Sequence, residues 1–233
     1  MSVTAVTDRV SVLGFYRTTV GKKVVMAVTG LIWVGYVIVH MFGNLKLFEG
    51  PGTINAWGVF LREVGGPVFR NGSVLWAFRL VLITALVLHI LAAFQISKLD
   101  LESRPVPYSA RRDVQASFAS RTMRWGGAAI LLFIIYHLLH MTTGTVHPDF
   151  REGDIYHNLV TGLRVPLVAL VYIAAMLALG LHLYHGVWSM FQTVGLNDER
   201  RTRLLRGLAT VVAVGVAAGF VSLPLAILLG LVR

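Results

Sequence analysis

The residues best suited to chemistry in this sequence are histidines. Six of the eight lie inside or at the end of long apolar runs: His40, His89, His137, His140, His182 and His185. Polar side chains are costly inside a membrane span and are usually functional there. An imidazole can ligate a metal, relay a proton or make a buried hydrogen bond. These three chemistries are the alternatives that the pattern allows.

Five apolar runs of about 20 residues, each long enough to cross a bilayer, must position these side chains. They cover approximately residues 24–43, 75–96, 126–143, 165–190 and 208–232. The 233 residues are 56% hydrophobic and 14% charged, with a mean hydropathy of +0.71, whereas about a quarter of a soluble domain is charged. We therefore predict an all-α integral membrane protein, with residues 1–233 as a single transmembrane domain of five helices.

The composition also excludes several classes. A soluble enzyme, a disordered chain and a secreted disulfide scaffold do not fit, and with no cysteine the chain cannot ligate an iron–sulfur cluster or attach a c-type haem. Residues 1–21 lack the apolar core of a signal peptide. We expect them to be a retained cytoplasmic or interfacial segment.

The basic residues orient the chain. Two thirds of the 21 Lys and Arg residues lie in the N-terminal segment and in the second and fourth connections between spans. By the positive-inside rule, the N-terminus is cytoplasmic and the C-terminus lies outside, in a multi-pass protein of the cell inner membrane. The net charge of +10 is therefore mostly a topology signal, and we expect no nucleic-acid partner.

The depth of the histidines in these spans sorts them into two layers. His40 and His137 lie in the outer half of the first and third spans, and His89 and His182 in the inner half of the second and fourth. Two imidazoles on facing helices can clamp a haem, and a bis-His b haem carries electrons because it has no open iron position. The first four spans would form this bundle. The spacing leaves His140 open as an alternative to His137, and His185 as an alternative to His182.

Several stretches, spread over the first four spans, resemble the single-subunit di-haem cytochrome b membrane anchor of succinate dehydrogenases and fumarate reductases. They are Gly21-Lys22-Lys23 to Thr29-Gly30, Val39-His40-Met41-Phe42-Gly43-Asn44, His89, Tyr136-His137-Leu138-Leu139-His140-Met141-Thr142, and His182-Leu183-Tyr184-His185-Gly186-Val187-Trp188-Ser189.

This resemblance implies two b haems, a proximal one on His89 and His182 and a distal one on His40 and His137. It implies a flavoprotein subunit and an iron–sulfur subunit on the cytoplasmic side, and a quinone, with menaquinone as the family tendency. The chain would then serve succinate:quinone oxidoreduction, the step that links the tricarboxylic acid cycle to respiration, in a complex that can form higher oligomers. The alternatives are a di-haem anchor of another quinone-linked dehydrogenase and a haem-free transporter that relays protons through histidines.

Other candidates surround these layers. Arg79 and Arg164, near the outer ends of their spans, could contact propionates of the distal haem. His140, His147 and Glu49 are candidates for an outer quinone site, which needs a hydrogen-bond donor and a proton route. Some family members carry a Glu two residues before the fourth-span ligand; here that position is Gly180. A carboxylate proton path of that kind is therefore not expected.

Overall fold

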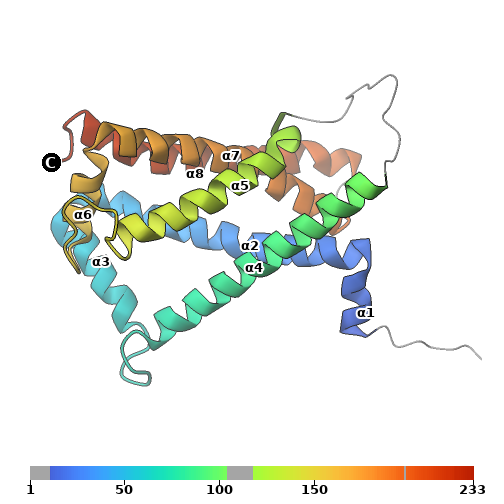
Figure 1. Ribbon diagram of the computed structural model, residues 1–233, viewed down its shortest axis with the longest axis horizontal. Coiled ribbons are helices and arrows are strands. Elements are labelled where there is room, and N and C mark those ends of the chain that lie inside the picture. The colour runs from blue at the N-terminus through green and yellow to red at the C-terminus, as the bar shows by residue number, and fades with distance from the viewer. Residues whose placement is uncertain (1–10, 104–117, 197) are drawn as a thin grey trace, which may run out of the picture.

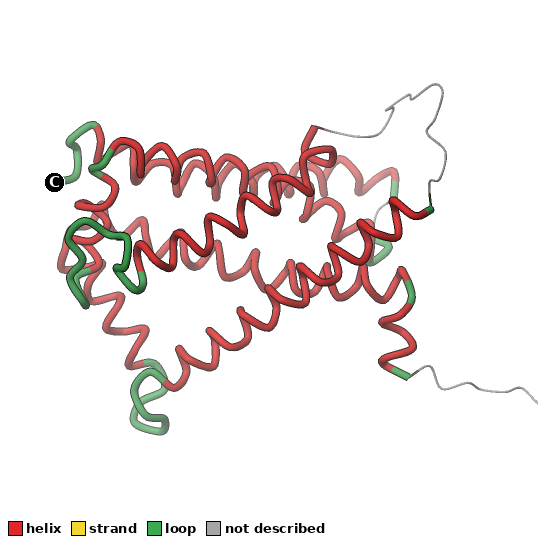
Figure 2. The backbone as a smooth tube through the Cα atoms, viewed as in Figure 1, coloured by secondary structure: helices red, strands yellow, loops and turns green. Residues whose placement is uncertain are grey.

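The computed structural model describes residues 11–103, 118–196 and 198–233. Within these ranges the chain is helical and contains no strand (Figure 2). The elements, in order, are α1 (Val12–Arg17), α2 (Thr19–Leu45), the 3-10 helix η1 (Lys46–Glu49), α3 (Pro51–Glu63), α4 (Ser73–Glu102), α5 (Phe118–Met141), α6 (Ile155–Leu163), α7 (Pro166–Thr193) and α8 (Glu199–Leu228).

Five of these described helices, α2, α4, α5, α7 and α8, are long and apolar enough to cross a membrane. The predicted all-α membrane fold with five spanning helices is confirmed. Most of these helices extend past the predicted apolar runs at one or both ends. Helix α8 ends at Leu228, short of the predicted residue 232. Of the predicted N-terminal segment 1–21, the first ten residues lie outside the described ranges; the rest forms α1 and the start of α2.

Figure 1 shows the long helices running along one common direction, with α4 and α5 crossing it obliquely. Helix α7 packs along α8 and α5, and α2 packs against α4, α7 and α8. We call the end that holds α3 and α6 the outer end, and the end that holds α1 and the start of α8 the inner end, following the orientation predicted from charge.

Helix α8 carries no histidine and packs against α7 and α2. Its side chains Ala213 and Val216 share a buried cluster with Met41 of α2 and Leu183 of α7. At Gly219 a Cβ atom would collide with the thioether of Met41. Small residues let apolar helices approach closely in a membrane, and here they bring α8 onto α2.

The outer end differs from the sequence-based expectation. Residues 44–73 and 144–164 lie between the predicted apolar runs, and turn signals such as Gly50-Pro51-Gly52 favour long loops there, but these stretches contain α3 and α6. Gly50 has a φ of 101° and precedes Pro51, which is the first residue of α3. Proline is favoured at this position because its fixed φ suits a helix and its missing N–H is not needed.

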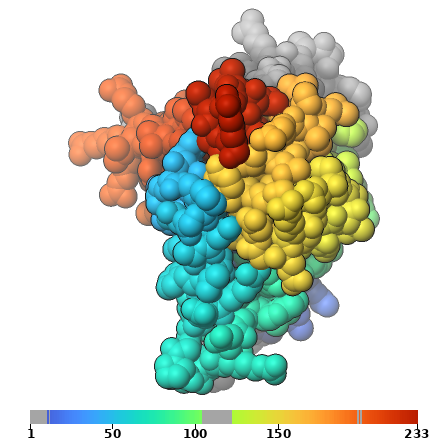
Figure 3. Space-filling model, turned by 90° about the vertical axis from the view of Figure 1, so that its left-hand side faces the viewer, coloured from blue at the N-terminus to red at the C-terminus, as the bar shows by residue number. Residues whose placement is uncertain are grey.

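These two short helices close the outer end (Figure 3). Leu47, Ile54, Leu159 and Leu163 are buried with Leu223 of α8 in one cluster. Asn55 of α3 donates to the Asp154 carboxylate (3.0 Å) and accepts from the backbone N–H of Tyr156 (3.1 Å). Apolar burial and this polar clamp hold α3 and α6 together.

Candidate functional site

The inner end brings together the imidazoles of His89 on α4 and His182 on α7, which we call the inner pair. Their ring centroids lie 6.3 Å apart with a 58° angle between ring planes. The spacing pattern left His185 as the alternative to His182. The structure gives His185, one turn further along α7, no ring contact with His89.

The ring of His89 is held by α2. Its Nδ1 lies 3.2 Å from the Met26 carbonyl oxygen and 3.1 Å from the Thr29 hydroxyl oxygen. The carbonyl can only accept, and Thr29 directs its own hydrogen to the Val25 carbonyl at 2.7 Å. The hydrogen of His89 is therefore on Nδ1, which leaves the Nε2 lone pair free to bind a metal.

Two glycines face the inner pair. A Cβ atom at Gly30 of α2 would lie 3.4 Å from Cε1 of His89, and one at Gly127 of α5 would lie 3.7 Å from Cε1 of His182. The Nδ1 atom of His182 is buried and has no hydrogen-bond partner in the described part of the chain. Glycine backbone beside both rings keeps side chains out of the space around the pair.

The outer half of the bundle brings together His40 on α2 and His137 on α5, the outer pair. Their ring centroids lie 5.9 Å apart at 79°. The pair is surrounded by aromatic rings: Tyr36 stacks on His40 at 5.3 Å, and Phe133 stacks on His137 at 5.8 Å. Phe220 of α8 lies 5.8 Å from His40. The outer pair is therefore enclosed by rings where the inner pair is faced by glycines.

A tyrosine that sequence reasoning missed connects the two histidines of α5. The hydroxyl oxygen of Tyr172 on α7 lies 3.2 Å from Nδ1 of His137 and 2.9 Å from Nδ1 of His140. His140 is completely buried and is held away from His40 by these contacts. The available signal was a polar side chain inside the fourth apolar run, ten residues before His182.

His140 belongs instead to a second cluster at the outer end. Its ring stacks on that of His147 at 4.8 Å. The backbone N–H of Asp149 donates to His147 Nδ1 at 3.0 Å, so His147 carries its hydrogen on Nε2 and donates to the Asn158 carbonyl at 2.8 Å. A Cβ atom at Gly162 of α6 would lie within 3 Å of both rings. Two of the three predicted quinone-site residues are thus neighbours.

The third, Glu49, is not among them. It lies at the end of η1, where its exposed carboxylate is 3.8 Å from the Lys46 amine. Within the part of the chain that the structure describes, the Glu49 carboxylate makes no hydrogen bond or ion pair with His140 or His147.

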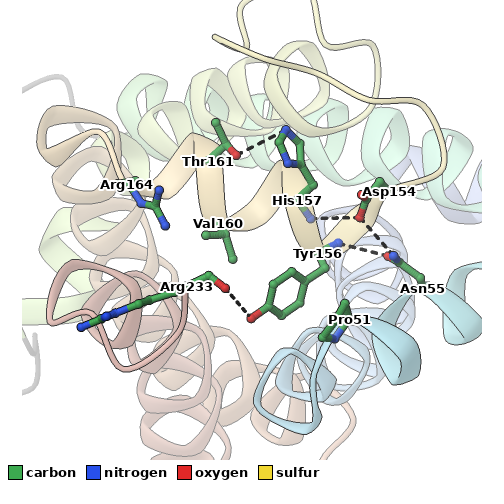
Figure 4. A pocket seen from close by; sticks show the side chains of 9 residues that line it. All are labelled: Pro51, Asn55, Asp154, Tyr156, His157, Val160, Thr161, Arg164 and Arg233. Atoms are coloured by element: carbon green, nitrogen blue, oxygen red, sulfur yellow. Dashed lines mark hydrogen bonds between the residues drawn. The ribbon is translucent and has the colours of Figure 1, made fainter.

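The two predicted propionate partners lie in different surroundings. The Arg79 guanidinium lies 4.8 Å from the Trp76 ring centroid and interacts electrostatically with Tyr36, which stacks on His40. Arg164 lines a cavity of about 390 Å³ at the outer end, together with Asn55, Asp154, Tyr156, His157 and Arg233 (Figure 4). Of the two, Arg79 is the one that interacts electrostatically with a neighbour of the outer pair.

The carboxyl group of Asp154, which lines this cavity, has a shifted pKa. The backbone N–H of His157 and the side-chain amide of Asn55 hold the pKa of the Asp154 carboxyl below its usual value, because both donate to the ionised form. The carboxylate is thereby committed to capping α6 and to the clamp with α3.

The two pairs fit a metal held between opposed imidazoles. Two metal–nitrogen bonds of about 2 Å each hold ring centroids roughly 6 Å apart, close to the separations of both pairs. Within the described ranges no group of three or more His, Asp or Glu residues could hold a metal by itself. The remaining ligands would have to come from a macrocycle, which is what a haem supplies.

Fold and site together define a class: a five-span helical membrane protein with paired histidines in two layers. The succinate dehydrogenase/fumarate reductase transmembrane subunit family matches residues 108–221. This part of the chain is similar to that family, which supports the predicted resemblance to a membrane-anchor subunit. The match includes His137 and His182 but neither His40 nor His89. No curated protein and no solved structure matches the chain.

Proposed function

We propose that this chain is the di-haem cytochrome b anchor of a succinate:quinone oxidoreductase, passing electrons from an iron–sulfur subunit to a quinone. His89 and His182 would hold the proximal haem, and His40 and His137 the distal one. The observation that carries the proposal is the pairing itself: two imidazole pairs, each from two different helices, with ring centroids 6.3 and 5.9 Å apart.

A bis-His b haem supplies one-electron transfer without an open iron position. The chain's own residues do the rest. The Met26 carbonyl and Thr29 hydroxyl fix the His89 ring and keep its Nε2 free, and Tyr172 does the same for His137. Arg79 would be the propionate contact, because it interacts electrostatically with Tyr36, which stacks on His40. Arg164 lines the outer cavity instead.

The quinone would bind near the outer pair, with His140 and His147 as the candidate proton-handling groups; His147 would face the quinone, because His140 is completely buried beside it. Glu49 is the weakest of the three because its carboxylate is exposed beside Lys46. The expected quinone is menaquinone, by the family tendency. The flavoprotein and iron–sulfur subunits would dock at the inner end, where Arg124 pairs with Asp100 at 2.9 Å and Arg206 lies over Trp188.

The test is haem stoichiometry on the purified complex, by pyridine haemochrome and by reduced-minus-oxidised spectra. We expect two b haems per copy of this chain, and one in each of the variants His89→Leu and His40→Leu. His185→Leu and His157→Leu are the matched controls and should keep both haems. A colourless wild-type complex would refute the cytochrome function and favour a proton-relay transporter.

A further inference from the structure

The Tyr172 hydroxyl is the one group within hydrogen-bond distance of Nδ1 of His137 in the described part of the chain, and it is shared with His140. Both Nδ1 atoms compete for a hydroxyl that has a single hydrogen. At most one imidazole can accept this hydrogen, so at least one must donate to the oxygen. Because no other acceptor for the hydroxyl hydrogen lies among the described residues, the arrangement that satisfies all three groups has one imidazole donating and the other accepting.

Metal binding decides which imidazole donates. A neutral histidine that ligates through Nε2 keeps its hydrogen on Nδ1, so a ligating His137 donates to the Tyr172 oxygen. Tyr172 then gives its own hydrogen to Nδ1 of His140, which places the His140 hydrogen on Nε2. The opposite direction would put the His137 hydrogen on Nε2 and block ligation.

The hydrogen-bond chain from His137 through Tyr172 ends at His140, inside the protein. Nε2 of His140 is buried and has no hydrogen-bond partner in the described residues, and His140 has no exposed surface. A Cβ atom at Gly162 would lie 2.9 Å from this Nε2, so the backbone of α6 comes close to it. Tyr172 itself is buried, with Phe133 at 5.0 Å and Tyr136 at 6.1 Å edge-on to its ring. The geometry fixes the hydroxyl between the two imidazoles.

We propose that Tyr172 is a positioning residue that orients His137 and lowers the midpoint potential of the outer haem, with His140 acting through it. The inference rests on the proposed function. A hydrogen bond accepted from Nδ1–H makes the imidazole a more basic ligand, which favours ferric over ferrous iron. Because Tyr172 donates its own hydrogen to His140, its oxygen is a stronger acceptor, as in other polarised hydrogen-bond chains.

The inner pair supplies a matched comparison. His89 donates to a backbone carbonyl and to the oxygen of Thr29, so the same influence is exerted there by different atoms. Thr29→Val should therefore shift the inner haem alone, and Tyr172→Phe the outer haem alone. Tyr136→Phe is the control for loss of a tyrosine hydroxyl, because it keeps the ring and its hydroxyl has no hydrogen bond to the described residues.

The experiment is a redox titration of the intact complex with low-temperature electron paramagnetic resonance of the two ferric haems. In Tyr172→Phe we expect two haems, an upward shift in the potential of the component that His40→Leu removes, an altered g-tensor for that haem, and no change in the other. Tyr136→Phe should match wild type. A two-haem Tyr172→Phe complex with unchanged potentials and g values would overturn the inference.

His140→Gln keeps the inference testable where Tyr172→Phe loses the outer haem. This variant retains Tyr172 but weakens the acceptor of its hydrogen, so a smaller upward shift of the same component is expected; an unchanged potential overturns the inference. Failure of the proposed function looks different, since the wild-type complex would then lack the outer haem altogether.

Discussion

The two histidine pairs are built from the same residue type but are held in different surroundings. The inner pair has glycine backbone beside both rings, at Gly30 and Gly127. The outer pair is enclosed by Tyr36, Phe133 and Phe220, and one member is tied to Tyr172. Both pairs have a hydrogen-bonded imidazole, but the inner pair has glycine backbone where the outer pair has aromatic side chains.

This difference separates two ways in which a protein can prepare a cofactor site. Space is provided by small residues and is lost when a large side chain is introduced. Orientation is provided by hydrogen-bonded and stacked partners and is lost when a single polar atom is removed. Substitutions at the two layers should accordingly fail in different ways, and the following predictions test this.

The largest effect is expected from filling the inner space. Gly30→Leu would place a branched side chain where even a Cβ atom already contacts His89, so the inner haem should be lost and the haem content should halve. Gly35→Leu is the control on the same helix, because a Cβ atom there has nothing within 4 Å. The measurement is haem per chain after purification. Two haems in Gly30→Leu would show that the glycine is not needed for space.

A smaller effect is expected at the outer cluster. In Gly162→Ala the new methyl group would lie 2.7–2.9 Å from atoms of His140 and His147, and such overpacking costs about 1–3 kcal/mol. We expect a lower melting temperature and a broadened outer-haem spectrum, with the inner haem unchanged. Gly186→Ala, which meets nothing within 4 Å, is the control. An equal disturbance of both haem spectra would contradict the separation of the layers.

The smallest effect is expected at the clamp between α3 and α6, outside both layers. Asp154→Ala removes the N-cap of α6, and loss of a cap costs about 1 kcal/mol. Because the folded-state pKa of Asp154 is lowered, its contribution is complete above the unfolded value of about 3.9 and is lost as pH falls through the folded value. Melting curves of the two proteins should differ at pH 7 and begin to converge as the pH falls below about 4.

Both haem spectra should be the same in Asp154→Ala as in wild type at pH 7. A spectral change confined to the outer haem would mean that the clamp extends to the outer pair. A stability difference that persists at the lowest pH would mean that Asp154 stabilises α6 by something other than its charge.

The long helices could be predicted from the sequence because a continuous apolar run of about 20 residues identifies a membrane-spanning helix. From depth it predicted two layers, since a helix fixes the height of every residue along its axis: His40 with His137 or His140, and His89 with His182 or His185. The family resemblance favoured His137 and His182. Their role as haem ligands stays a prediction. Helices α3 and α6 were missed because they are short and their signals, Pro51 after Gly50 and the Asp154 cap, also occur in turns.

The partners of the histidines could not be read from the sequence. Thr29 and Tyr172 contact His89 and His137 across 60 and 35 residues of chain, and such contacts depend on the rotation of each helix about its axis. Periodicity is weak in helices that are apolar on every side. The choice between His137 and His140 was open for the same reason; in the structure His137 lies against His40, whereas His140 stacks on His147.

One helix connects the two layers. Helix α2 carries Met26 and Thr29 beside the inner pair and His40 in the outer pair, with Trp33 and Tyr36 edge to face between them at 5.5 Å. The eleven residues from Thr29 to His40 make about three full turns and roughly 16 Å of rise. Both sites therefore lie along one face of a single helix, and the helix geometry fixes their relative orientation and the distance between them. Any functional asymmetry between them has to come from the surroundings of each ring and not from an adjustable distance.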